Sequence, residues 1–369
     1  MIVVDGVALQ SNLETPPSII TFWQNVVGEW LKLGHSRDFV VLVRESQRIA
    51  LPGDTVIAVI PDYSYEDAES DHVGLQSACD QLKATLFIST LYTYPLRTPS
   101  VAMIYSVDES QEFLSNLAAQ EKHNSILNAS AFICPSEWVA SNLMAKYPGI
   151  SKEDIEVIYP GLHGDLGPSP PLKLRKFREE RDLTRPYIIY RAGAGERRKI
   201  AFRAILDSLS EIASGQVPEV VYLSVDGSRT DSPLESFVDL SKPIRARIHN
   251  LKLSPDELPL LYTGATGLLE VEPELGMGNY VLEAMRCGCP VIILRESQRK
   301  VEHANAPEPW IEIPLEPHAI SQAIDQLRDT KYRGSVLSQG LIYTKNMTWE
   351  EAAKRMWSFL DLKAKNITS

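Results

Sequence analysis

Short apolar runs alternate with amphipathic segments along the chain, a pattern that predicts alternating strands and helices. The apolar runs lie at residues 2–9, 39–43, 55–60, 84–88, 101–105, 131–134, 155–158, 187–190, 220–225, 248–251, 267–269, 291–293 and 310–313. Repeated strand–helix units favour parallel strands with helices on both faces of the sheet. We therefore expect an α/β fold built on doubly wound parallel sheets.

Helical spacing and capping residues mark the segments between these runs. Apolar positions from Ile19 to Trp30 recur at helical spacing and end before Gly34. Helix starts are expected at Ser136 and at Ser254-Pro-Asp-Glu257, and further helices at residues 117–127 and 317–327. Residues 62–71 are acidic and aromatic, and we expect a solvated surface loop there, with an acceptor-binding loop as the alternative.

The C-terminal segment carries a clear helix signal. Thr348 and Glu351 form a capping box, which satisfies backbone donors of the first helical turn. One helical face then collects the apolar residues Trp349, Ala352, Ala353, Met356, Trp357 and Leu360. This segment is expected to be an amphipathic helix that buries one face.

The length of 369 residues fits two domains better than one. Residues 162–172 are rich in Gly and Pro and form the expected linker. The predicted division is an N-terminal domain at 1–165, a C-terminal domain at 166–345, and a last helix at 346–369. The basic run at 172–181 is expected to be a solvated helix face in a chain with this acidic balance.

Composition and charge exclude several classes of function. The chain has 44% hydrophobic and 23% charged residues, which is ordinary for a globular protein, and no apolar run approaches the ~18 residues of a membrane span. Its formal net charge of −11 argues against a nucleic-acid partner. The start lacks the basic region of a secretory signal, and the four cysteines lack disulfide density. A cytoplasmic protein with reduced thiols is expected.

A glycine turn at Gly276-Met277-Gly278 separates the apolar run 267–269 from a predicted helix. Glycines let a backbone approach a ligand closely, and free amides at a helix start favour an anion such as phosphate. Asn279 is a plausible N-cap, and Glu283 is placed to accept hydrogen bonds from a diol such as ribose. The alternative interpretation is a packed crossover whose Glu283 complements the helix dipole.

A second glycine-rich turn, at residues 191–199, gathers Arg191, Arg197, Arg198 and Lys199 at the start of a predicted helix. Cations at a helix N-terminus are locally unfavourable unless an anion binds there. The turn is therefore interpreted as a phosphate site, with an exposed basic helix start as the alternative.

The residues from Ser254 to Ile293, with Val-Leu-Glu-Ala-Met-Arg-Cys-Gly-Cys-Pro-Val-Ile after the glycine turn, resemble the donor-binding core of the GT-B glycosyltransferases of family 4 (glycosyl transferases group 1). The block from Cys134 to Leu162 is similar to that family as well. The resemblance implies two Rossmann-like domains facing across a cleft, with the acceptor on the first and a nucleotide-sugar donor on the second. It also implies a last helix that crosses back to the N-terminal domain.

The implied activity is retaining transfer of a hexose-type sugar from a nucleotide-diphospho-sugar to a hydroxyl acceptor, in a process such as polysaccharide biosynthesis. The acceptor is a glycan, a lipid-linked molecule or a small molecule, and a peripheral membrane contact is left open. Neither a metal nor another cofactor is expected, because no Asp-x-Asp motif is present and no histidine has metal-ligand spacing.

The resemblance also assigns roles to residues. Donor binding is expected from Arg191, Arg197, Arg198, Lys199, Gly276, Met277, Gly278, Asn279, Tyr280 and Glu283, and catalysis from Asp108, Glu274 and Lys199. Three departures stand against the family pattern: Leu275 replaces a Glu, Val107 replaces a His, and residues 15–18 replace a glycine pair. They motivate an alternative function, a catalytically degenerate GT-B protein that regulates or scaffolds an active transferase. A GT-B epimerase, a phosphorylase or a dinucleotide oxidoreductase fits the motifs less well.

Overall fold

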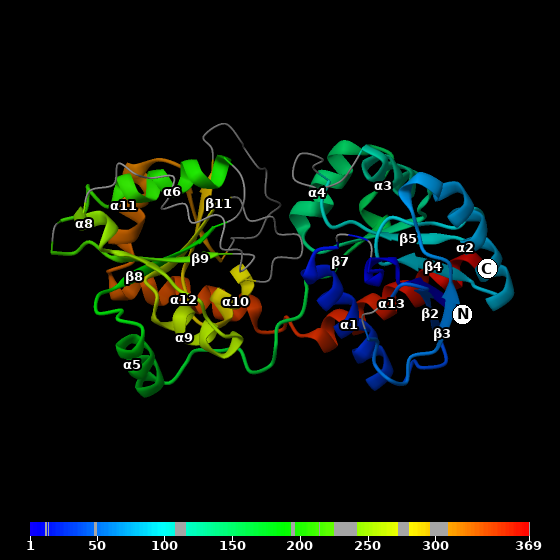
Figure 1. Cartoon of the computed structure of the whole chain (residues 1–369), viewed down its shortest axis with the longest axis horizontal. Helices are drawn as coiled ribbons and strands as arrows, with labels where there is room; N and C mark the ends of the chain where they lie inside the picture. Colours follow the sequence, from blue (N-terminus) through cyan, green and yellow to red (C-terminus); the bar gives the residue numbers. More distant parts are fainter. Residues whose placement is uncertain are drawn as a thin grey trace. The chain divides into compact units, whose positions relative to one another are not determined.

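The computed structural model describes residues 1–11, 13, 15–47, 50–107, 116–192, 196–213, 215–224, 242–271, 280–295 and 309–368. These residues form two compact units, each with its own parallel sheet and core (Figure 1). Unit 1 contains Met1–His163 and Met347–Ser369, and unit 2 contains Gly164–Pro273 and Tyr280–Asn346. The end of the chain therefore belongs to the unit that begins it.

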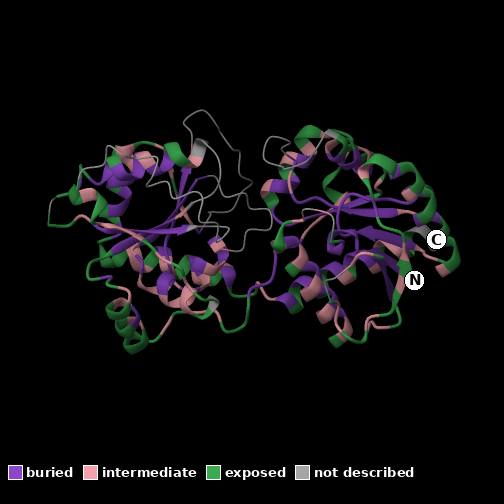
Figure 2. Ribbon diagram, in the orientation of Figure 1, coloured by how far each residue is buried: buried purple, intermediate pink, exposed green. Residues whose placement is uncertain are grey.

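The sheet of unit 1 has seven strands in the order β3-β2-β1-β4-β5-β6-β7, and every neighbouring pair is parallel. Its central strands are buried on both faces (Figure 2), which explains their continuous apolar runs. The strands are β1 (Ile2–Asp5), β2 (Phe39–Arg44), β3 (Ile57–Ile60), β4 (Leu86–Ser89), β5 (Ser100–Met103), β6 (Ala131–Cys134) and β7 (Ile155–Val157).

The helices of unit 1 cover both faces of this sheet. They are α1 (Pro17–Lys32), α2 (Ala68–Leu82), α3 (Asn116–Asn128), α4 (Glu137–Lys146) and α13 (Trp349–Thr368), with short 3-10 turns at η1 (Val7–Leu9), η2 (Tyr65–Asp67) and η4 (Lys152–Asp154). Helices α1 and α13 lie side by side (Figure 1) and close the largest core cluster. Trp30 of α1 donates a hydrogen bond of 3.0 Å to the carbonyl of Ala353.

The sheet of unit 2 has six parallel strands in the order β10-β9-β8-β11-β12-β13. They are β8 (Tyr187–Ala192), β9 (Glu219–Ser224), β10 (Ile248–Asn250), β11 (Gly267–Val271), β12 (Val291–Arg295) and β13 (Ile311–Pro314). The helices are α5 (Pro171–Glu180), α6 (Glu196–Ser208), α8 (Lys242–Arg245), α9 (Leu258–Gly264), α10 (Tyr280–Arg286), α11 (Pro317–Gln326) and α12 (Thr330–Thr344), with a 3-10 turn η5 (Pro255–Glu257). Helices α6 and α11 pack on one face and α9, α10 and α12 lie on the other (Figure 1).

The predicted α/β class with doubly wound parallel sheets is confirmed. Several helix signals also take the predicted form. Ser136 accepts a hydrogen bond of 3.2 Å from the amide of Val139, and Thr348 accepts one of 3.1 Å from the amide of Glu351. Gly288, with φ of +73°, ends the segment after α10 in the left-handed conformation that glycine adopts readily.

Two sequence predictions are wrong. The run at residues 2–9 is not one strand, because β1 ends at Asp5 and Val7–Leu9 form a 3-10 turn. Residues 62–71 are not simply a surface loop, because η2 and then α2 begin within them. Acidic side chains favour a helix N-terminus electrostatically, and Ser64 caps the amide of Glu66 at 3.2 Å. The acidic composition therefore belongs to a helix start.

Candidate functional site

In each sheet, one pair of neighbouring strands is followed by connections that lead in opposite directions along the sheet. This place is the switch point of the sheet. In unit 1 this point lies between β1 and β4, and in unit 2 it lies between β8 and β11. Ligands of open α/β proteins bind at the carboxyl ends of the strands at such a switch point. The side chains at the two switch points therefore decide which unit offers a ligand site, and of which charge.

The switch point of unit 2 holds a buried ion pair. Arg198, in the first turn of α6, places Nη1 3.0 Å from Oε1 of Glu270 on β11 and donates a hydrogen bond of 3.0 Å to the carbonyl of Arg191. Oε1 of Glu270 also accepts from the amide of Val271, at 3.2 Å. Tyr190 donates a hydrogen bond of 2.7 Å to the carbonyl of Arg198, which fixes the helix start against β8.

Electrostatics at this pair follow from its burial. Burial raises the pKa of Glu270 above its usual range, and the nearby Arg198 opposes that shift. Burial alone would lower the pKa of Arg198, but Glu270 and then Tyr280 offset this, so the pKa of Arg198 lies above its ordinary value. The contact between Arg198 and Glu270 joins the start of α6 to β11.

Arg191 supplies a second cation at the same switch point. Its guanidinium carbon lies 4.2 Å from the ring centre of Tyr280, the first residue of α10, which is a cation–π contact. Withdrawal of the Tyr280 hydroxyl from water raises the pKa of that group, with Glu270 as the next cause. Residues from β8, β11, α6 and α10 thus meet at one point of unit 2.

Lys199 and Glu283 complete the described part of this site. Lys199 follows Arg198 on α6 and is exposed. Glu283 lies in the first turn of α10, and both Glu283 and Arg191 act on the pKa of the Tyr262 hydroxyl on α9, which burial raises above its usual range. Glu283 and Arg191 are therefore both within electrostatic reach of the Tyr262 hydroxyl.

The switch point of unit 1 holds a different set of charged groups. Asp5, at the end of β1, pairs with Arg44, which also pairs with Asp71 of α2. Thr93 donates a hydrogen bond of 2.6 Å to Oδ2 of Asp5. One guanidinium is thus shared by two carboxyl groups at this strand end, whereas two arginines meet at the switch point of unit 2.

The remaining predicted site residues lie beyond what the structure describes. Asp108, Glu274, Gly276, Met277, Gly278 and Asn279 fall outside the described residues, and so does the side chain of Arg197. Their expected roles stay predictions. Val107 is described: it is buried in the apolar cluster of α4, where its side chain offers no hydrogen-bonding group.

Two residues of the site were not predicted from the sequence. Glu270 and Tyr262 are both fully buried, and Oε2 of Glu270 and the hydroxyl of Tyr262 have no hydrogen-bond partner in the part of the chain that the structure describes. A signal for Glu270 was present, because a carboxylate within the apolar run Leu268-Leu-Glu-Val271 requires a buried partner. The partner itself was hidden, since Arg198 lies far away in the sequence.

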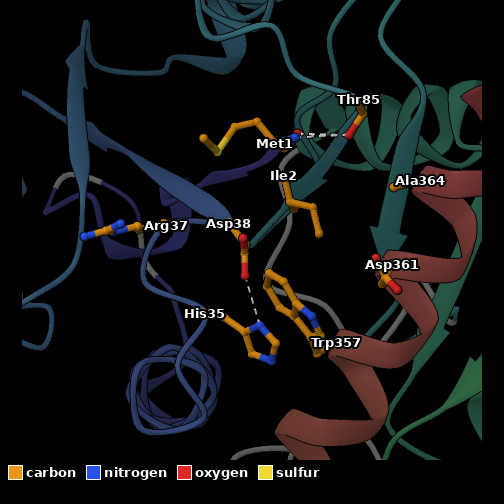
Figure 3. A pocket seen from close by; sticks show the side chains of 9 residues that line it. All are labelled: Met1, Ile2, His35, Arg37, Asp38, Thr85, Trp357, Asp361 and Ala364. Carbon is orange, nitrogen blue, oxygen red and sulfur yellow. Dashed lines mark hydrogen bonds and ion pairs between the residues drawn. The ribbon is translucent and has the colours of Figure 1, made fainter.

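A cavity of about 350 Å³ lies in unit 1 at the edge of the sheet where the strands begin, opposite the switch point. It lies next to the start of β2 and to α13 (Figure 3). His35 stacks on Trp357 with ring centres 3.9 Å apart, and its Nδ1 lies 3.2 Å from Oδ2 of Asp38. The side chains of His35, Trp357 and Asp38 thus interact with one another. Ligands of parallel α/β sheets bind at the edge where the strands end.

Within the described ranges, no group of three or more His, Cys, Asp or Glu side chains gathers in a way that suits a metal ion. No described helix combines the length and apolar character needed to cross a bilayer.

The sequence matches no protein-family model and no curated protein. Solved structures do match the whole chain. Anabaena HepE in complex with UDP-glucose shares 15% identity over 98% of this chain and 99% of that one, with a TM-score of 0.67. A glycosyltransferase from Rickettsia africae shares 15% identity over 99% of this chain and 98% of that one, with a TM-score of 0.69. Sucrose-phosphate synthase from Thermosynechococcus elongatus shares 14% identity over 97% of both chains, with a TM-score of 0.67. At this identity the likeness concerns the fold, and the chain has the GT-B fold.

Proposed function

We propose that the protein is a glycosyltransferase that takes its sugar from a nucleotide-diphospho-sugar bound to unit 2. The observation that carries the proposal is the cationic switch point between β8 and β11, where Arg191, Arg198 and Lys199 meet the start of α6. Support comes from the solved structures of the same fold, among which Anabaena HepE holds UDP-glucose.

The chemistry of such a transfer matches these side chains. A nucleoside diphosphate develops negative charge as the bond to the sugar breaks, and fixed cations and helix N-termini stabilise that charge best in the transition state. In the proposal, Lys199 and Arg191 contact the diphosphate, and Glu283 accepts hydrogen bonds from the ribose. Asp108 and Glu274 are the proposed groups at the reacting sugar.

The finer parts of the proposal follow the family resemblance. We propose retaining, metal-independent transfer of a hexose-type sugar, with the hydroxyl acceptor bound by unit 1. The product's anomeric configuration, read by NMR, tests the retaining part: an inverted product contradicts it. Activity that persists in excess chelator is expected, and activity that disappears contradicts metal independence.

A nucleotide panel tests the donor site first. UDP, GDP, ADP and dTDP are added to the wild type and to Glu283→Ala and Lys199→Ala while thermal unfolding is followed. A ligand at a hundred times its dissociation constant stabilises the folded state by about 2.7 kcal/mol, which is readily visible. We expect one nucleotide to stabilise the wild type and both variants to lose most of that gain. The absence of any shift in the wild type contradicts the proposal.

The alternative function, a catalytically degenerate GT-B protein, has one structural observation in its favour. Val107 is buried among apolar side chains at a position where the family pattern has a His. Transfer or donor hydrolysis by the purified wild type, lost in Lys199→Ala, rules this alternative out. Nucleotide binding without turnover on any acceptor favours it.

A further inference from the structure

Glu270 is an unusual residue for its place in the fold. It lies in β11 between Leu269 and Val271, and its side chain has no exposed surface. An ionised carboxylate in such surroundings requires a partner, because desolvation of an unpaired charge costs several kcal/mol. Arg198 is that partner, yet 22% of its own side chain remains exposed. Part of the Arg198 side chain therefore stays accessible while its Nη1 contacts Glu270.

The pair is incompletely satisfied. Oε1 of Glu270 takes both Arg198 and the amide of Val271, while Oε2 accepts no hydrogen bond from the described residues. On the other side, Nη1 of Arg198 is divided between Glu270 and the carbonyl of Arg191. Such a pair holds the arginine charged and oriented, but less tightly than the two parallel bonds of a bidentate pair.

We propose that Glu270 is an internal counter-ion of Arg198. Without a ligand, Glu270 is the anion that pairs with the guanidinium; on binding, the guanidinium shifts part of its interaction from Glu270 to the ligand's phosphate. The inference rests on the proposed function, because the phosphate in question is that of the nucleotide donor. Glu270 is here a positioning residue: it is buried behind Arg198 and acts on the ligand only through the arginine.

A competition between two anions for one cation has a distinctive signature. In Glu270→Gln, Arg198 loses its counter-ion, so without ligand the variant is less stable than the wild type. A bound diphosphate replaces the missing charge, so the gain in melting temperature on adding ligand must exceed that of the wild type. A residue that only supports the fold would lower the melting temperature without enlarging the ligand-induced gain.

The experiment measures melting temperature and ligand affinity for the wild type, Glu270→Gln, Arg198→Gln and the double variant, with inorganic pyrophosphate and UDP as probes. We expect Glu270→Gln to bind both probes at least fivefold more tightly than the wild type, the lower end of typical coupling between sites. Arg198→Gln should bind them more than fivefold more weakly. In the double variant two neutral amides replace the charges, so it recovers melting temperature but binds as weakly as Arg198→Gln.

Asp5→Asn in unit 1 is the matched control, because Asp5 and Arg44 also form a fully buried pair. It should lower the melting temperature and leave the gain with UDP unchanged. If Glu270→Gln fails to fold, the double variant still decides: UDP binding equal to that of the wild type overturns the inference.

Different results contradict the counter-ion role of Glu270 and the proposed donor site. If UDP and pyrophosphate stabilise the wild type but Glu270→Gln gains no more than the wild type, only the counter-ion role is overturned. If no nucleotide and no pyrophosphate stabilises the wild type, the donor site itself is wrong and the counter-ion role fails with it.

Discussion

At the scale of single residues, the site of unit 2 is built from polar groups that are buried before any ligand is present. Arg198 pairs with Glu270, while the hydroxyl of Tyr262 has no hydrogen-bond partner among the described residues. A buried polar group without a partner costs about 1–3 kcal/mol. The residues at the proposed donor site are therefore not those that would give the most stable fold.

Tyr262→Phe should consequently stabilise the protein at neutral pH, by about 1 kcal/mol, because it removes an unpaired buried hydroxyl. The gain should grow in alkali. The pKa of Tyr262 is raised in the folded state, so above the ordinary tyrosine value near 10 the unfolded chain releases a proton that the folded chain keeps, and stability falls as pH rises. Each pH unit in that window costs the wild type about 1.4 kcal/mol that the variant retains.

Urea unfolding at pH 7 and at pH 10.5–11 measures both effects. Tyr105→Phe is the control, since the Tyr105 hydroxyl accepts a hydrogen bond of 2.7 Å from Trp23 and donates one of 2.8 Å to the carbonyl of Thr90. That variant should be destabilised at pH 7. A Tyr262→Phe protein less stable than the wild type at both pH values contradicts the account.

At the scale of elements, α13 is joined to the first unit through a tight crossing of two chain segments. Leu162 forms an isolated parallel bridge with Thr348, and its amide donates to the carbonyl of Met347 at 3.0 Å. A Cβ added to Gly161 would clash with the amide nitrogen and the Cα of Trp349. Because these are backbone atoms, only glycine fits at this crossing.

Gly161→Ala is expected to destabilise unit 1 by about 1–3 kcal/mol, the usual cost of forcing extra atoms into a packed region. Gly164→Ala is the matched control, since a Cβ at Gly164 meets nothing within 4 Å. Urea unfolding of both variants, followed by tryptophan fluorescence, makes the comparison. Equal stability of the two variants would show that the crossing is not rigid.

The sequence predicted the helices and strands better than it predicted the side-chain pairs that join them. Periodicity and caps are local, so Ser136, Thr348 and the apolar runs were sufficient to locate most helices and strands. The pairs of Arg44 with Asp71 and of Arg198 with Glu270 join distant parts of the chain, and they follow only from the order of strands in each sheet. The resemblance indicated the cationic turn at Arg191 to Lys199, but not which arginine is neutralised within the fold.

At the scale of the whole molecule, the two units differ in how they use the chain. The described part of unit 2 lies between residues 164 and 346, whereas unit 1 needs both ends of the chain. Trp349, Ala353 and Met356 of α13 are buried in the same cluster as Phe22 and Trp30 of α1. The core of unit 1 is therefore incomplete without α13.

A chain that ends at Asn346 should accordingly lose the structure of unit 1 and keep that of unit 2. Hydrogen exchange is expected to show protected amides in β8 and β11 and fast exchange in β1 and β2. UDP should still bind, since the switch point of unit 2 is intact. A chain that ends at Lys363 retains the buried face of α13 and is the control. Protection of β1 in the shorter chain would contradict this dependence on α13.

The position of α13 also bears on the order of events during synthesis on the ribosome. Domains usually fold from the N-terminus as they emerge. Here residues 1–163 leave the ribosome before α13, whereas residues 164–346 have all been synthesised before that helix appears. During that interval the face of α1 with Phe22 and Trp30 lacks its partner α13, so the nascent chain should present an aromatic surface to chaperones until α13 has emerged.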